Sequence, residues 1–185
     1  MTNEPARVCP WQHAWFLDNW VRRAVHNPDR IIGRYLEEGQ TVLDLGCGPG
    51  MFSLAMARMV GEGGKVISVD IQDEMLQILR QKSERAGLDS RIILHKSQTG
   101  VIGISEKVDF ALAFYMVHEV PDRLGFLSEV ASLLKPQGRF LIAEPKFHVS
   151  NSSFEETVAI AESTGMRQIS RPKVLFSRAA LLQKV

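Results

Sequence analysis

The sequence predicts a doubly wound α/β fold, a mostly parallel β-sheet with helices on both faces. Two almost wholly apolar runs, 41–45 and 109–115, are typical of strands that are buried on both sides. The first run leads into a glycine-rich turn, and helical and extended patterns then alternate to the end of the chain. Alternation of this kind is typical of strands joined by crossover helices. With 185 residues, the chain has the size of a single α/β domain.

The first half of the predicted sheet contains two strands and two helices. A short helix over 29–37 leads into the strand at 41–45. Apolar residues at helical spacing predict a helix over 51–60, directly after the glycine-rich turn. The second strand follows at 65–70 and ends in an aspartate.

The middle of the chain continues the alternation. Asp73 is a predicted N-cap for a helix over 73–86, and a third strand follows at 91–96. After the central strand, a proline-aspartate pair opens a helix over 122–134, which the following lysine-proline pair ends. A glycine then begins the fifth strand, over 138–145.

The last elements are one helix and two strands. Residues 153–156 read S-F-E-E, a capping box that predicts a helix start, and Gly165 ends that helix. Strands at 166–170 and 179–184 complete the sheet.

The turn after the first strand reads D-L-G-C-G-P-G from Asp44. Gly46, Gly48 and Gly50 permit backbone conformations closed to other residues and leave no side chain between the chain and a ligand. The next helix directs its free N–H groups into the same space. Asp70, at the end of the second strand, is placed to bind both hydroxyls of a ribose. Together these features predict a cofactor that contains adenosine.

The spacing of the glycines distinguishes among such cofactors. The dinucleotide fingerprint would place its third glycine at position 51, which is Met51, whereas here it is Gly50. The ending of a phosphate-binding P-loop is absent. Asp44 would repel a pyrophosphate but suits an ammonium group, and it is placed to accept hydrogen bonds from the loop or, through water, from the ligand. S-adenosylmethionine, which has an amino-acid tail and no phosphate, is therefore the predicted cofactor.

Four motifs in order resemble those of the class I methyltransferases. They are D-L-G-C-G-P-G at 44–50, V-D at 69–70, V-D-F at 108–110 through to His118, and L-K-P-Q-G-R at 134–139. The resemblance covers the chain from about residue 28. It implies a seven-stranded sheet in the order 3-2-1-4-5-7-6, with strand 7 antiparallel. It implies no particular substrate, because this fold carries many activities.

The resemblance also implies contacts to the cofactor. Asp70 would hold the ribose, and Ile71 would lie flat against the adenine. Gln98 stands where relatives read the adenine amino group; its amide oxygen accepts the same hydrogen bond, unless it is a loop residue without a role. The predicted cofactor-binding set is Asp44, Gly46, Cys47, Gly48, Gly50, Asp70, Ile71, Gln98 and Phe114.

Side chains for catalysis are expected beyond the carboxyl ends of the strands. Tyr115, His118 and Glu119 follow the fourth strand, and Glu144 and His148 follow the fifth. Of these we predict roles in catalysis for Tyr115, His118 and Glu144. Alignment of the reactants drives most in-line methyl transfers, and a general base is needed only for a weakly acidic acceptor. His118 therefore either contacts the acceptor or fixes its own loop by hydrogen bonds.

Composition limits the partners. The chain has 22 basic and 21 acidic residues, so no net field attracts nucleic acid or an anionic membrane. No apolar run is long enough to span a bilayer, and the first residues lack the regions of a secretory signal. Cys9 and Cys47 have no partners at metal-ligand spacing, so no metal site is expected. We expect a cytoplasmic enzyme, with homodimer formation left open.

The N-terminal segment is rich in tryptophan. Trp11, Trp15 and Trp20 lie near helical spacing. The chain is therefore divided into an aromatic helical extension, 1–27, and a methyltransferase domain, 28–185. The extension is either a lid over the cofactor, as class I enzymes often have, or a helix at the sheet edge or a dimer contact.

A small-molecule methyltransferase of the quinone type is the leading functional prediction. Arsenite chemistry would need several neighbouring thiols, and the chain has two cysteines. Methylation of RNA or protein is the second reading, but the Asn/Asp-Pro-Pro-Tyr/Phe motif of amine-methylating enzymes and a basic, aromatic nucleic-acid groove are both absent. A non-catalytic module that binds S-adenosylmethionine is the third reading. Such a module would show a damaged glycine turn or would lack the acid that binds the ribose, and this sequence shows neither change.

Overall fold

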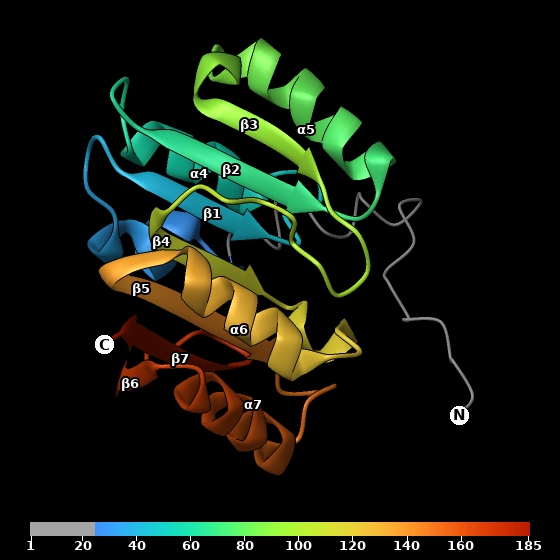
Figure 1. The fold of residues 1–185 in the computed structure, drawn as a ribbon. Coiled ribbons are helices and arrows are strands. Elements are labelled where there is room, and N and C mark those ends of the chain that lie inside the picture. Colours follow the sequence, from blue (N-terminus) through green and yellow to red (C-terminus); the bar gives the residue numbers. More distant parts are fainter. Residues whose placement is uncertain (1–24) are drawn as a thin grey trace.

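A seven-stranded sheet crosses the computed structural model, which describes residues 25–185 (Figure 1). The strands are β1 (Thr41–Leu45), β2 (Lys65–Asp70), β3 (Ile92–Lys96), β4 (Val108–Phe114), β5 (Leu134–Pro145), β6 (Met166–Ser170) and β7 (Ser177–Lys184). Their order in the sheet is β3-β2-β1-β4-β5-β7-β6. Strands β1, β2, β3, β4 and β5 are parallel to one another, and β7 runs antiparallel to its neighbours β5 and β6. The predicted fold class and strand order are confirmed.

Helices cover both faces of the sheet. The helices are α3 (Pro28–Ile32), α4 (Met51–Met59), α5 (Asp73–Ala86), α6 (Arg123–Leu133) and α7 (Asn151–Ser163), with short turns η2 (Gly33–Tyr35), η3 (Asp89–Arg91) and η4 (Val117–Glu119). Alternate strand residues point to opposite faces, so Leu112 packs with the α3, α4 and α5 side and Ala111 with the α6 and α7 side. Figure 1 shows α6 and α7 in front of the sheet and α4 behind it.

Several element boundaries differ from the sequence prediction, and three of them have a clear structural reason. Asp73 is the first residue of α5 rather than its N-cap, and its carboxylate pairs with Lys96. The N-cap of α7 is Ser150, whose hydroxyl accepts a hydrogen bond from the Ser153 backbone N–H at 3.1 Å, so the predicted capping box is wrong. Strand β5 begins at Leu134, because that residue pairs with Val108 before a register shift in the ladder.

The connectivity places the carboxyl ends of β1, β2, β4 and β5 along one edge. The order of the strands reverses between β1 and β4, which is where ligands bind in open α/β sheets. The aromatic extension predicted at the N-terminus lies outside the described residues, except for its last three, 25–27, and its role stays a prediction. Within 25–185, none of the helices has the length and apolarity that a bilayer crossing requires.

Candidate active site

A cavity of about 540 Å³ lies at the carboxyl ends of the central strands. Its volume is typical of small-molecule sites. All the predicted site residues line it except Gly50 and Glu144; those that do are Asp44, Gly46, Cys47, Gly48, Asp70, Ile71, Gln98, Phe114, Tyr115 and His118. Ten of the twelve predicted residues therefore lie around one cavity, whereas Gly50 and Glu144 do not line it.

The glycine-rich turn forms one wall of this cavity. Gly46, Gly48 and Gly50 all have positive φ angles, 66°, 52° and 91°, which other residues rarely adopt. The Cys47 backbone N–H donates to the Val69 carbonyl at 3.0 Å and ties the turn to β2. Burial raises the pKa of the Cys47 thiol, which keeps it a neutral filler of the turn.

Gly50 has a packing role. A Cβ atom built on this residue would lie 2.2 Å from Cδ1 of Leu79 on α5. The absence of a side chain therefore lets α5 approach the start of α4, and Gly50 itself does not line the cavity as predicted. Gly46 is also tight, since a Cβ there would lie 3.0 Å from the Met116 side chain.

Asp70 is held in place by backbone donors. The Gly48 N–H donates to Oδ2 and the Gln72 N–H donates to Oδ1, each at 2.9 Å. Asp70 is only 8% exposed, and burial raises the pKa of its carboxyl against the lowering effect of these hydrogen bonds. The carboxylate therefore lies between the glycine-rich turn and Ile71, beside the surface where a ribose was predicted.

Asp44 is buried beneath the turn, and its partner differs from the prediction. The Ser53 hydroxyl on α4 donates to Oδ2 of Asp44 at 2.5 Å, and the Ser68 hydroxyl donates to Ser53 at 2.9 Å. Of the two predicted roles, hydrogen bonds from the loop give way to this chain of hydroxyls from α4 and β2, and the contact to the ligand through water stays a prediction. Burial, with a smaller contribution from the charge of Asp70, raises the pKa of Asp44 to about 7.

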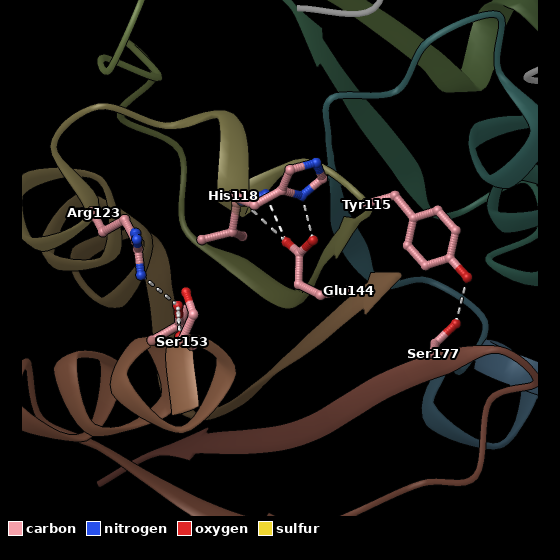
Figure 2. Close-up of polar contacts among 8 residues, drawn as sticks. Tyr115, His118, Arg123, Glu144, Ser153 and Ser177 are labelled. Atoms are coloured by element: carbon pink, nitrogen blue, oxygen red, sulfur yellow. Dashed lines mark hydrogen bonds and ion pairs between the residues drawn. The ribbon is translucent and has the colours of Figure 1, made fainter. Parts of the chain in front are cut away.

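His118 lines the cavity and forms a pair with Glu144, which lies behind it (Figure 2). Glu144 is 1% exposed and accepts hydrogen bonds from His118 Nδ1 at 2.5 Å and from the backbone N–H groups of Val117 and His118 at 2.8 and 3.3 Å. The Glu144 hydrogen bond raises the pKa of His118. Figure 2 shows the second ring nitrogen pointing away from Glu144, so Glu144 orients a histidine whose other nitrogen is available.

The Tyr115 side chain lines the cavity, and its hydroxyl is hydrogen-bonded. Its φ angle is 65°, in the left-handed region, and its ring stacks on Phe114 with centroids 4.4 Å apart. The hydroxyl lies 2.6 Å from Ser177 Oγ (Figure 2) and 3.1 Å from His26 Nε2. The strained backbone therefore directs the ring across the sheet toward β7.

Several residues of the site are not in the predicted set. Glu119 and His148 line the cavity beside His118, and the His118 and His148 rings are parallel with centroids 6.4 Å apart. Burial raises the pKa of Glu119 to about 7. His26 is 7% exposed and donates from Nε2 to the Leu175 carbonyl at 3.0 Å. No sequence signal marks His26, because its partners lie 89 and 149 residues away.

A family model described as a methyltransferase domain matches residues 36–174, well over half of the chain. The chain belongs to this methyltransferase family. The site is thus that of a class I, S-adenosylmethionine-dependent methyltransferase, as the sequence motifs predicted.

One solved structure and two sequence relatives illustrate the likeness. A SAM-dependent methyltransferase from Aquifex aeolicus is 28% identical, with a TM-score of 0.87 over 96% of this chain and 100% of the other. A demethylmenaquinone methyltransferase from Oceanobacillus iheyensis is 29% identical over 59% of this chain and 46% of the relative. A ubiquinone biosynthesis O-methyltransferase from Haemophilus ducreyi is 31% identical over 68% of this chain and 56% of the relative. The methyltransferase therefore matches only about half the length of these two relatives.

The residues present fit the cofactor of the family. The turn offers a surface without side chains, because Gly46 and Gly48 line the cavity and a Cβ at Gly46 would already be crowded. Asp70 presents a carboxylate on the same side, which is suited to two ribose hydroxyls. Asp44 adds a second acid near the turn, which favours a positively charged ligand over a phosphate. This donor set is that of a cationic nucleoside, in agreement with S-adenosylmethionine.

Proposed function

We propose that this methyltransferase acts on a small, flat and largely apolar acceptor. The observation that carries the proposal is the aromatic part of the cavity lining. Besides the glycine-rich turn and Asp70, the cavity is lined by aromatic side chains that include Tyr115, Phe126, Phe147 and Phe176. Aromatic side chains favour ring-shaped ligands through stacking and burial of apolar surface. The names of the two relatives, which are enzymes of quinone methylation, support this substrate class.

The cofactor, when bound, supplies a methyl group that is activated by a positive sulfonium. The chain would bind its ribose through Asp70 and would stabilise its positive charge through Asp44. The aromatic lining would align the acceptor and exclude water, and such alignment accounts for about 7–11 kcal/mol of a barrier in favourable cases.

His118 is the residue that we propose to accept a proton from the acceptor. Glu144 holds Nδ1, so the neutral ring would receive the proton on Nε2, and the carboxylate would stabilise the positive imidazolium that results. Glu144 is then a positioning residue rather than one that contacts the acceptor. Tyr115, with its hydroxyl bound to Ser177, acts as part of the wall.

A screen for methyl transfer tests the proposal. The purified 185-residue chain is incubated with methyl-labelled S-adenosylmethionine and a panel of catechols, hydroquinones and phenols, together with total RNA and unmodified protein. The expected result is label in ring-shaped acceptors, lost in Asp70→Asn and reduced in His118→Gln. Label confined to RNA or protein would favour the macromolecular alternative, and tight cofactor binding without any product would favour the sensor module.

A further inference from the structure

A second hollow, of about 630 Å³, lies beyond the ends of β5 and β7. Its wall is formed by the residue that follows β5, the loop that leads into β7, the first residues of β7 and the start of α7. The charged residues that line it are Lys146, Glu155, Arg171, Lys173 and Arg178. We call this surface the basic hollow. It adjoins the active-site cavity, because Phe176 lines both.

The basic hollow carries an uncompensated positive charge. It is lined by four basic side chains and one acidic side chain. The single acid, Glu155, is already bound by Arg171, whose Nη1 and Nη2 donate to its two carboxylate oxygens at 3.0 and 2.6 Å. Among residues 25–185, Lys146, Lys173 and Arg178 have no ion pair. In a chain of net charge +1, three unneutralised cations around one hollow are a marked concentration.

Arg178 is the most informative of these residues. Its Nε and Nη1 atoms are shielded from solvent and find no hydrogen-bond acceptor within the described part of the chain. The residue opposite it in the sheet is Glu144, which would be the natural partner. Both oxygens of Glu144 are bound to the His118 ring and the η4 backbone, and no hydrogen bond or ion pair to Arg178 is formed within residues 25–185. Guanidinium donors that are buried without an acceptor are costly and call for an explanation.

The chemistry of these donors defines the missing partner. A guanidinium presents parallel N–H groups that match the two oxygens of a carboxylate or phosphate. Lysine ammonium groups add positive charge but do not pair with two oxygens in this directional way. Arg178 lines the hollow, so we expect rotation about its outer torsions to present the shielded donors to a ligand there.

We propose that the basic hollow is a subsite for an anionic group, a carboxylate or phosphate, carried by the methyl acceptor. This inference rests on the proposed function, since it assigns the acceptor a ring in the active-site cavity and an acidic substituent beyond Phe176. The aromatic rings of Phe147 and Phe176, whose centroids are 6.0 Å apart, lie at the boundary. The backbone N–H of Lys146 donates to the Phe176 carbonyl at 3.0 Å, and this hydrogen bond fixes the two loops to each other.

Direct binding tests the subsite without any turnover. The 185-residue chain, saturated with S-adenosylhomocysteine, is titrated with benzoate and with uncharged benzamide at constant ionic strength, and the backbone amide signals of Phe176 and Ser177 are followed by NMR. We expect saturable shifts with benzoate and none with benzamide. In Arg178→Gln the benzoate affinity should fall about tenfold or more, as for loss of a charge-assisted hydrogen bond. Arg167→Gln, an equal charge change on the neighbouring strand β6, is the matched control and should bind benzoate like the wild type.

Two further arms keep the test decisive. Lys146→Ala changes an exposed side chain, so it reports on the subsite if Arg178→Gln fails to fold. Inorganic phosphate should compete with benzoate for the same signals. Equal shifts with benzamide, or equal benzoate affinity in the Arg178, Lys146 and Arg167 variants, would overturn the proposal.

Turnover then distinguishes the subsite from the proposed function. With 3,4-dihydroxybenzoate and 3,4-dihydroxybenzamide as matched acceptors, we expect kcat/KM to favour the acid about tenfold, and Arg178→Gln to abolish that preference with the amide rate unchanged. Methylation of both with no preference would refute the subsite and leave the function intact. Binding that depends on Arg178, without methylation of any acceptor, would support the subsite and refute the function.

Discussion

The buried acid beneath the glycine-rich turn gives cofactor binding a predictable dependence on pH. The pKa of Asp44 is raised to about 7, chiefly because burial penalises its charged form. Below pH 7 the carboxyl is therefore mostly protonated and neutral. A positively charged cofactor favours the ionised form, so binding should release a proton and should weaken as the pH falls.

The size of this effect follows from the pKa of about 7. About three quarters of the Asp44 side chains are ionised at pH 7.5 and about one tenth at pH 6.0. If only the ionised form binds tightly, the affinity for S-adenosylmethionine falls about eightfold across this range. The window stays below the usual pKa of an α-amino group, about 7.7–8.0, so the ligand keeps its positive charge.

Asp44→Asn is the variant that tests this reasoning. The amide keeps the shape of the side chain and still accepts the Ser53 hydrogen bond, but it cannot ionise. We expect weak binding that does not change between pH 6.0 and 7.5, at the level of the wild type at low pH. Calorimetry in two buffers with different heats of ionisation measures both the affinity and the proton released.

Stability without cofactor provides an independent check. The pKa of Asp44 in the folded protein exceeds its usual value of 3.8. The free energy of unfolding should therefore fall as the pH rises from about 4 to about 7, by up to about 4 kcal/mol. Asp44→Asn should remove this loss. A wild-type affinity that stays constant between pH 6.0 and 7.5, with no proton released, would refute the electrostatic role of Asp44.

Three other substitutions follow from the site. Asp70→Asn should lower cofactor affinity about 10- to 100-fold in calorimetry, since a neutral amide accepts ribose hydrogen bonds weakly; unchanged affinity would exclude this residue from the ribose site. Glu144→Gln should lower the pKa of His118, because the hydrogen bond that raises it is weakened. The low-pH limb of the methylation rate should then move to lower pH, and an NMR titration of His118 that matches the wild type would contradict this. Gly50→Ala should destabilise the protein in urea by about 1–3 kcal/mol more than Gly87→Ala, because both have positive φ but only Gly50 would meet a neighbouring side chain; equal losses would rule out the packing role.

Features that depend on local sequence could be predicted. The strand ranges were recognisable because buried parallel strands are continuously apolar, and the strand at 65–70 agrees with β2 at both ends. The turn from Gly46 to Gly50 and the acid at Asp70 were recognisable by spacing alone. Helix starts were less predictable, because several residues near Ser153 can cap a helix and only the path of the chain selected Ser150.

The roles of side chains depended on distant partners. Glu144 stands at the strand end where the sequence placed it, yet it faces His118 and the η4 backbone rather than the cavity. His26, Tyr115 and Ser177 meet although they are far apart in the chain. No local pattern reports such contacts, since they form only when β4 and β7 lie on either side of β5.

The sequence by itself thus determined the sheet, the glycine-rich turn and the acid that accompanies it, because backbone conformation and strand burial are set by neighbouring residues. Only the tertiary structure decided which groups face the ligand, which hold them, and where Arg178 lacks an acceptor. The reason is physical: hydrogen bonding and desolvation act through space, and they couple residues whose separation along the chain carries no information.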